Sequence, residues 1–576
     1  MKTLLRLIVF ARKYWLRLSL ALLSVLIATF FSLAIPRILG EAIDSILDQG
    51  DRSLLLLAAL AILGASIMRG VSAYGNSYLS ESASQKTAYD IRNAIYDRLQ
   101  RLSFAYHDSS QTGQLMSRAT ADVEAIRIFF GRGLVGISQT ILLFAGISYL
   151  LIIMNWQLAL LTLAFLPIIG WRAVTVSNHL RPIWLKIQEL VAALGTILEE
   201  SLTGIRVVKA FSRQNEESRK FSIQARVLHD ERIGATRQMA LNSPFMVFLI
   251  SLATAFILWY GGRQVINENI TIGNLTQFIL YLNMMAMPVR RLGFMANILS
   301  RTVSAGERVL EILDTESPVT EKGDAIELNQ VKGLVSFNDV TFSYNSVVVL
   351  KNVSFEAPAG KLVALVGGLG SGKSTVAHLI PRFYDVSTGR ITIDDTDIRD
   401  VTLASLRHNI GIVQQDIFLF SATIRDNIAY GATNASHDEI IAAAKAAQLH
   451  DFVLSLPDGY NTWVGERGIT LSGGEKQRVA IARTLLINPA ILILDDSTSS
   501  VDAGTEHLIR QALGEVIEGR TTFVITHRLP IIKNADLILV LKNGAIAEQG
   551  KHNELIEKNG LYRQIYQSQL LTAETT

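Results

Sequence analysis

The sequence of 576 residues contains one glycine-rich stretch whose spacing suits phosphate binding. After the apolar run Leu362 to Val366 come Gly367, Gly368, Leu369, Gly370, Ser371, Gly372, Lys373, Ser374 and Thr375. Glycines let backbone N–H groups close around phosphate oxygens, and a helix that starts here presents its positive N-terminus to them. We expect Lys373 to reach the β- and γ-phosphates of a nucleotide and the Ser374 hydroxyl to hold Mg²⁺. An ordinary glycine-rich turn is the alternative, which the strand-to-helix context disfavours.

A second site of chemistry is expected where two carboxylates end an apolar strand. The run Ile491 to Leu494 is followed by Asp495 and Asp496. Beside a phosphate-binding loop, the first carboxylate would belong to the Mg²⁺ shell and the second would orient or deprotonate a water molecule. Two acids at a strand end are by themselves weak evidence for such a site, because surface carboxylates are common. The presence of the phosphate-binding loop in the same chain strengthens this interpretation.

The segment between these two features carries the most specific signal. It reads Leu471-Ser472-Gly473-Gly474-Glu475-Lys476-Gln477-Arg478 and opens a predicted helix. Here the chain resembles the ATP-binding cassette (ABC) family, whose signature motif this octapeptide is similar to. The resemblance implies that two such chains pair, with each ATP held between the phosphate loop of one chain and the signature of the other. Ser472 and the helix N-terminus after it offer donors to a phosphate, which suits that role.

Five shorter segments extend the resemblance. Tyr344 resembles the residue whose ring stacks on adenine, and Gln415 resembles the glutamine that contacts Mg²⁺ and the membrane domain. His527 is similar to the switch histidine that contacts the γ-phosphate, and Asp502 to the aspartate of a loop that contacts the other subunit. Gly465 to Gly468 resembles a loop of exporters that senses the cytoplasmic helices.

One residue departs from the family pattern. The family usually has glutamate directly after the first acid of the strand, and this chain has Asp496. The shorter carboxylate would fall about 1 Å short of the attacking water, and a misplacement of about 1 Å can cost about a hundredfold in rate. The resemblance therefore suggests the degenerate-site subunit of a heterodimeric exporter whose partner supplies the catalytic glutamate. A homodimer that tolerates Asp496 is the alternative, and an ATP-gated channel or regulatory subunit is an alternative of another class.

These residues are carried by a chain whose composition is unlike that of a soluble enzyme. It is 49% hydrophobic and only 18% charged, where soluble chains carry about a quarter charged residues. The absence of cysteine excludes disulfides, zinc clusters built from cysteine and cysteine nucleophiles. The net charge of +3 is too small to indicate a nucleic-acid partner, so we expect none.

The apolar excess is concentrated in the first half of the chain. Six stretches with almost no charge predict transmembrane helices, at about 18–36, 53–80, 133–153, 157–175, 238–262 and 270–290. Lysine and arginine cluster before the first span and in the two long connections, so the positive-inside rule places both termini and these connections in the cytoplasm. A cleaved signal peptide is disfavoured because the first apolar run is too long. We expect a multi-pass protein of the cell (plasma or inner) membrane.

The two long cytoplasmic connections are predicted to be continuations of the membrane helices, since loops of such length without a core are uncommon. We expect the chain to turn back at Thr112 to Leu115 in the first connection and near Arg213 to Phe221 in the second. Residues 1–17 mix basic and apolar side chains, which suits a short helix on the inner leaflet.

After Arg308 the composition becomes that of a soluble domain, in which strand-like runs alternate with helical patterns. This order predicts a mostly parallel sheet covered on both faces. The predicted fold is a membrane all-α domain with six transmembrane helices and long cytoplasmic extensions, fused to an α/β P-loop ATPase domain of the ABC type. The predicted boundaries are 1–315 for the membrane domain, 316–332 for a linker and 333–576 for the nucleotide-binding domain. This is the layout of a half-transporter of the multidrug or lipid exporter type.

The substrate path should lie between the membrane helices of both subunits, and two sets of residues are candidates for it. Arg69 lies within the second span, where a lipid-facing charge is expensive, although snorkelling to an interface is an equal alternative. Asn283 with Met284, Met285 and Met287 of the sixth span would form an adaptable wall, or simple packing. Neither set names a substrate, so amphipathic drugs, lipids and peptides all stay open.

Overall fold

A computed structural model describes residues 2–49, 53–465, 468, 470–495, 511, 514, 517–526 and 528–575. The chain forms two compact units. The first contains Met1–Arg101 and Ser110–Thr315, and the second contains Leu102–Ser109 and Glu316–Thr576. Leu102–Ser109 therefore groups with the carboxyl-terminal half of the chain, although both of its flanks belong to the first unit.

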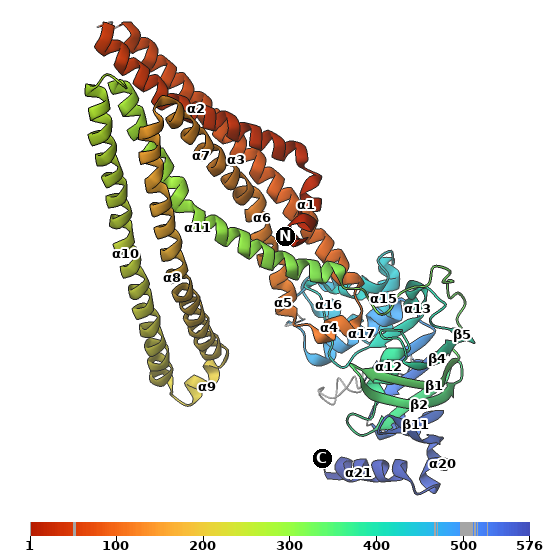
Figure 1. The fold of residues 1–576 in the computed structure, drawn as a ribbon. Coiled ribbons are helices and arrows are strands. Elements are labelled where there is room, and N and C mark those ends of the chain that lie inside the picture. The colour runs from red at the N-terminus through yellow and green to blue at the C-terminus, as the bar shows by residue number, and fades with distance from the viewer. Residues whose placement is uncertain are drawn as a thin grey trace. The chain divides into compact units, whose positions relative to one another are not determined.

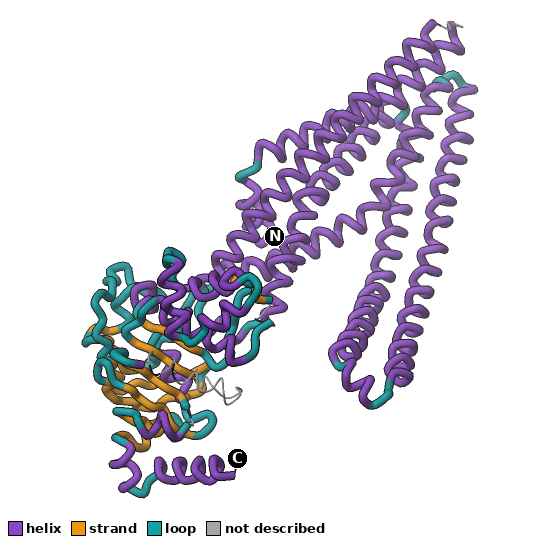
Figure 2. The backbone as a smooth tube through the Cα atoms, turned by 180° about the vertical axis from the view of Figure 1, so that it is seen from behind, coloured by secondary structure: helices purple, strands orange, loops and turns teal. Residues whose placement is uncertain are grey.

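Every element of regular secondary structure among the described residues of the first unit is a helix (Figure 1). Its long helices are α2 (Trp15–Gln49), α3 (Ser53–Arg101), α7 (Leu134–Met154), α8 (Trp156–Thr203), α10 (Gln214–Ile266) and α11 (Ile272–Asp314). Its short elements are α1 (Lys2–Arg12), α5 (Thr112–Ser117), α6 (Val123–Ile128), α9 (Ile205–Ala210) and the π-helical turns η1 (Arg118–Asp122) and η2 (Phe129–Gly133). Helix α8 runs along α10, and α2 runs along α3 (Figure 2).

Five helices of the described part are long and apolar enough to cross a membrane, by length and composition. They cover Trp15–Leu47, Leu55–Arg101, Thr112–Met154, Trp156–Thr203 and Gln214–Ile266. The sixth predicted span, 270–290, falls on the first part of α11. The third and fourth predicted spans are separated by a tight turn, in which the Asn155 side chain accepts a hydrogen bond from the backbone N–H of Leu158 (3.0 Å). This cap lets α8 begin directly after α7 ends.

Both bends lie before their predicted positions in the chain. In the first connection the chain turns across α4 (Phe104–Ser109), before the predicted Thr112 to Leu115, which form the start of α5. In the second connection α8 already ends at Gly204, whose N–H still bonds to the Glu200 carbonyl (2.8 Å). Ser212 then adopts a left-handed backbone (φ 52°), which breaks the helical path before α10 begins. The predicted Arg213 to Phe221 lies almost wholly on α10.

The second unit contains a six-stranded sheet and a four-stranded sheet. The six-stranded sheet has the order β12-β11-β3-β10-β9-β6, in which β12 alone pairs antiparallel. Its strands are β3 (Leu362–Gly367), β6 (Ile410–Val413), β9 (Ile491–Asp495), β10 (Thr521–Ile525), β11 (Leu537–Lys542) and β12 (Ala545–Gly550). The antiparallel sheet has the order β2-β1-β4-β5 and comprises β1 (Val335–Tyr344), β2 (Val347–Ala357), β4 (Thr388–Ile393) and β5 (Thr396–Asp397). A two-stranded ladder joins β7 (Ala422–Thr423) to β8 (Trp463–Val464).

Helices surround the sheets of this second unit. They are α4, α12 (Lys373–Leu379), α13 (Leu403–His408), α14 (Ile424–Ile428), α15 (His437–Ala446), α16 (His450–Ser455), α17 (Gly473–Leu486), α19 (Leu529–Lys533), α20 (His552–Glu557) and α21 (Leu561–Thr575). The central strands are apolar along their whole length because both faces are covered, and β3 is buried from Val363 onward. The predicted mostly parallel sheet is confirmed, and the antiparallel sheet is an addition that the sequence pattern did not reveal.

Candidate nucleotide site

Adjacent parallel strands bring the phosphate loop and its expected partners to one edge of the sheet. Strand β3 leads into Gly367, β9 ends at Asp495, and Gln415 follows the end of β6. In the register, Ile525 of β10 pairs with Leu365 of β3 on one side and with Asp495 on the other. Ligands of such open sheets bind outside the carboxyl ends of the strands. The strand order therefore gathers the predicted phosphate and Mg²⁺ ligands at one edge.

The phosphate loop has a backbone that only glycine can follow at two positions. Gly372 has φ 103°, and a Cβ added there would lie 2.7 Å from Cδ2 of the buried Leu350. A Cβ on Gly367 would lie 2.4 Å from the backbone oxygen of Leu541. The tip of the loop, with Leu369 fully exposed, keeps its backbone at the surface, where a phosphate can approach it.

The polar side chains of the loop suit a nucleotide with Mg²⁺. Lys373 Nζ donates to the carbonyls of Gly367 and Gly368, both at 2.9 Å, which holds the ammonium group over the loop. The buried Ser371 Oγ has no hydrogen-bond partner among the described residues, as expected of a donor that awaits a ligand. Ser374 is exposed and Thr375 is buried. Hydroxyl and carboxylate oxygens are ligands that Mg²⁺ prefers, so the donor set fits.

Tyr344 lies beside the phosphate-loop helix. Its half-buried ring meets the ring of Phe342 edge-on (4.7 Å between centroids, 89°) and that of Tyr384 in the same way (5.1 Å, 90°). Burial raises the pKa of the Tyr344 hydroxyl, and a hydrogen bond with Thr375 partly opposes the shift. The contact with Thr375 places the predicted adenine platform next to the loop that would hold the phosphates.

The predicted signature motif forms the start of α17. Ser472 caps the helix: its backbone N–H donates to Glu475 Oε2 (2.7 Å), and the Glu475 N–H donates to Ser472 Oγ (3.4 Å). This reciprocal pair is a capping box. Ser472 and Gly473 are exposed, whereas Gly474 and Gln477 are buried. The chain thus presents a fixed helix start at its surface.

Several predicted residues lie outside the described residues or remain exposed. Asp496, Asp502 and His527, like Glu466 and Arg467 of the exporter loop, are not among the residues that the structure describes. Gln415 is described and exposed. Their predicted roles stay predictions.

The candidate residues of the substrate path show no common site. Arg69 is exposed on α3. Asn283 is also exposed, and its amide donates to the Ile279 carbonyl of its own helix (2.9 Å). Met284 packs against the hydrophobic cluster around the buried Met285, as expected of ordinary packing, and the Met287 side chain lies outside the description.

Sequence reasoning missed a group of residues beside the nucleotide site. The Tyr384 hydroxyl donates to Asp108, and the ring of Phe104 stacks on Phe383 (4.1 Å, 22°). Burial lowers the pKa of His378, on α12, while the charges of Asp495 and Asp108 oppose the shift. No local pattern marks these residues, because Asp108 and Tyr384 are separated by 276 positions.

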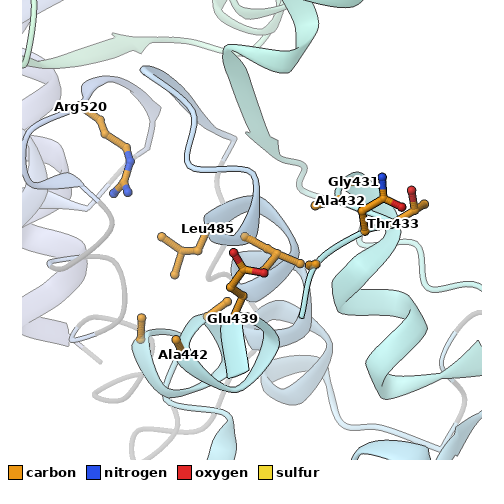
Figure 3. A pocket seen from close by; sticks show the side chains of 12 residues that line it. Gly431, Ala432, Thr433, Glu439, Ala442, Leu485 and Arg520 are labelled. Carbon is orange, nitrogen blue, oxygen red and sulfur yellow. The ribbon is translucent and has the colours of Figure 1, made fainter. Parts of the chain in front are cut away.

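A hollow of about 720 Å³ lies elsewhere in the second unit. Its lining includes Ala442 of α15, Leu485 at the end of α17 and Arg520 before β10 (Figure 3). None of the phosphate-loop residues lines it. It is therefore separate from the candidate nucleotide site.

Comparison with known proteins agrees with this geometry. The family described as the ABC transporter transmembrane region matches residues 18–289, and the ABC transporter domain family matches residues 350–499. The chain therefore belongs to the ABC transporter family, with the half-transporter layout of its exporters. It is an ATP-hydrolysing, multi-pass membrane protein with a cytoplasmic ATPase domain.

Three similar proteins extend the match over nearly the whole chain. The ABC transporter ATP-binding protein YknU of Bacillus subtilis is 40% identical over 95% of this chain and 94% of its own length. An ATP-dependent lipid A-core flippase of Syntrophus aciditrophicus is 37% identical over 98% of this chain and 94% of its own length. The solved structure of a bacterial Atm1-family ABC exporter with ATP bound is 33% identical, with a TM-score of 0.80, and covers 96% of this chain and 98% of that one.

Proposed function

We propose that this chain is one subunit of a dimeric pump that exports amphipathic substrates (drugs, lipids or peptides) at the expense of ATP. The observation that carries the proposal is that Gly367 to Thr375, Asp495 and Gln415 lie at the carboxyl ends of neighbouring parallel strands. The flippase named above, which acts on lipid A-core, supports a lipid or another amphiphile as the substrate class.

The residues of this chain would divide the work at the bound nucleotide. Lys373 neutralises the β- and γ-phosphates, and Tyr344 stacks on adenine. Ser374, Gln415 and Asp495 would hold Mg²⁺, which when bound neutralises charge on the transferring phosphoryl group. His527 contacts the γ-phosphate. Phosphoryl transfer depends on positioning and electrostatic stabilisation, so each of these roles is one of placement or charge.

The signature at the start of α17 would act on the ATP of the other subunit. Ser472, Gly473, Gly474 and Glu475 form a helix start that is already stabilised within this chain, and its first two residues, Ser472 and Gly473, are exposed. Asp502 would contact the other subunit as well. On this proposal neither chain completes an ATP site alone.

Asp496 makes this subunit the degenerate half of a heterodimer. Its carboxylate is shorter than that of glutamate by one methylene, so a water molecule beside the γ-phosphate is less well oriented. The alternative, a homodimer that tolerates Asp496, predicts a different result from purification without any partner gene. Robust ATPase activity of the chain alone, abolished by Asp496→Asn, would contradict the asymmetric arrangement. Co-purification from the native membrane identifies the partner directly.

Transport itself distinguishes a pump from an ATP-gated channel. The purified complex is reconstituted into vesicles with a fluorescent amphiphile, and accumulation is followed with ATP or with a non-hydrolysable analogue. A pump accumulates the amphiphile against its concentration gradient with ATP but not with the non-hydrolysable analogue. Equilibration with both nucleotides indicates a channel and would overturn the proposal.

A further inference from the structure

The connection between α11 and β1 is bonded to the second unit over most of its length. We call residues 320–334 of this connection the strap. Near its start, the Thr320 carbonyl accepts a hydrogen bond from the buried guanidinium of Arg382 (3.0 Å). Further along, Ile326 forms a short parallel bridge with two backbone hydrogen bonds (3.0 and 2.9 Å). Leu328 then enters the hydrophobic core of the sheets.

The strap holds the six-stranded sheet at the amino ends of its parallel strands. Asn409, directly before β6, donates from its amide to the Leu328 carbonyl (3.0 Å). The Asn409 carbonyl in turn accepts from the N–H of Ile491, the first residue of β9 (3.0 Å). Thr521, the first residue of β10, donates from its hydroxyl to the Gly333 carbonyl (2.7 Å). Because β6, β9 and β10 are parallel, these contacts lie at the edge opposite to the candidate nucleotide site.

Asp394 fixes the far end of the strap. Its carboxylate accepts hydrogen bonds from three successive backbone N–H groups, those of Lys332 (2.7 Å), Gly333 (3.2 Å) and Leu334 (2.9 Å). Successive N–H groups that converge in this way form a concave site for an anion. The backbone N–H of Asp394 also donates to the Leu334 carbonyl (2.8 Å). The strap therefore cannot leave the sheet without breaking this set of bonds.

The part of the connection that is free to bend is short. Thr315 still belongs to the end of α11, because its N–H bonds to the Glu311 carbonyl (3.0 Å). Val319 is already buried. Between these two positions lie only Glu316, Ser317 and Pro318. Three residues, one of them a proline with a fixed φ, can take up little displacement.

We propose that the strap transmits movements of the nucleotide-binding unit to α11, and that Asp394 is a positioning residue for transport because it anchors the strap to the sheet. The inference rests on the proposed export function. Strands that are bonded to their neighbours move together as a rigid body, so a displacement of the sheet displaces the strap. ATP binds at the opposite edge and does not need the strap. A loosened strap therefore reduces transport more than it reduces ATP hydrolysis.

The test compares transport with hydrolysis in the purified complex, reconstituted into vesicles. The quantity measured is the amount of a fluorescently labelled phospholipid moved for each ATP hydrolysed. Asp394→Asn suits the left-handed backbone at this position (φ 48°), but its amide has a single acceptor oxygen and cannot serve all three N–H groups. The ratio should fall at least about threefold, since the anchor loses charge-assisted hydrogen bonds. Affinity for a fluorescent ATP analogue should stay within about twofold, because the phosphate loop is unchanged.

Asp395→Asn is the matched control. It makes the same chemical change at the next residue, which also has a left-handed backbone (φ 64°) and is exposed. The Asp395 carboxylate has no hydrogen bond or ion pair within the part of the chain that the structure describes. The ratio of transport to hydrolysis should therefore stay as it is in the unmodified complex.

A second variant lengthens the connection and leaves every bond of the strap in place. Insertion of Gly-Ser-Gly after Pro318 should lower the ratio at least about threefold, because the flexible residues take up the displacement. The same insertion after the exposed Thr433, in a surface loop of the same unit, should leave the ratio unchanged, since exposed loops tolerate insertions.

The outcomes separate the role of the strap from the proposed function. An insertion after Pro318 that leaves the ratio unchanged would overturn the role of the strap. Equal losses of transport and hydrolysis in Asp394→Asn would likewise overturn the role of Asp394 in transport. An unmodified complex that hydrolyses ATP and moves the labelled lipid no faster than protein-free vesicles would instead contradict the proposed export function.

Discussion

The substitution Gly372→Ala tests the phosphate loop most sharply, because the structure assigns its cost to two sources. Gly372 has φ 103°, a left-handed backbone that costs a residue with a Cβ about 1–2 kcal/mol. The new methyl group would lie 2.7 Å from Cδ2 of Leu350, which is completely buried. Forcing a packed core side chain aside costs about 1–3 kcal/mol.

Together the backbone and packing terms raise the free energy of the phosphate-binding conformation of the loop by about 2–5 kcal/mol. The variant loop therefore favours other conformations, which do not bind phosphate. Since about 1.4 kcal/mol corresponds to a tenfold change in affinity, ATP binding should weaken at least about thirtyfold. The affinity is measured by displacement of a fluorescent ATP analogue from the full-length protein in lipid nanodiscs, together with the thermal unfolding temperature of each sample.

Gly368→Ala is the matched control within the same loop. A Cβ at Gly368 meets no atom within 4 Å, and its φ is not in the left-handed range. It should bind ATP within about threefold of the unmodified chain, because neither cost applies. The reasoning fails if Gly372→Ala binds ATP as well as the unmodified chain does, or if Gly368→Ala loses as much affinity.

Four further predictions concern the chemistry of the proposed site. Lys373→Ala should abolish ATP hydrolysis and weaken ATP binding at least about tenfold, because the β- and γ-phosphates lose their cation. Removal of Mg²⁺ with EDTA should stop hydrolysis reversibly, and activity that persists in EDTA would exclude Mg²⁺ from the mechanism. Ser472→Ala should lower the ATPase activity of the dimer while this chain's own ATP affinity stays within about twofold; Ser436→Ala removes an equivalent capping box from α15, costs about 1 kcal/mol of helix stability in the same way, and should leave activity unchanged. Asp496→Glu should raise the ATPase activity of the subunit about 10- to 100-fold by restoring the reach of the carboxylate, and an unchanged rate would remove the basis for a degenerate site.

Much of the fold followed from local patterns in the chain. The apolar spans and the strands around Leu362 and Ile491 were predicted because hydrophobic runs of a given length have few alternatives. The cap at Ser472 with Glu475 follows from the spacing of two residues within one turn. The end of α8 at Gly204 was not predicted. An isolated glycine is tolerated inside a helix, so its presence in a long helical pattern does not by itself indicate that the helix ends there.

In the candidate nucleotide site, too, the local motifs could be predicted from the sequence, whereas their arrangement in space could not. The phosphate loop, the acidic strand and the signature were each recognisable alone, because each is a short motif. The position of Asp495 relative to the phosphate loop depends on the strand order β3-β10-β9. In this order a single strand, β10, separates the strand that ends at Asp495 from the strand that leads into the loop. Strand order is set by how helices cover the two faces of the sheet, and no single segment encodes it.

The sequence alone determined the class of this protein: a membrane part with six apolar spans, an ATPase part with a phosphate loop and a signature, and the substitution at Asp496. These properties reside in residue types and in spacings of a few positions. Only the tertiary structure decided that Leu350 closes over Gly372 and that Asp108 meets Tyr384 across 276 positions of chain. Such contacts form only when distant segments pack together, because the free energy of packing depends on the shape of both surfaces at once.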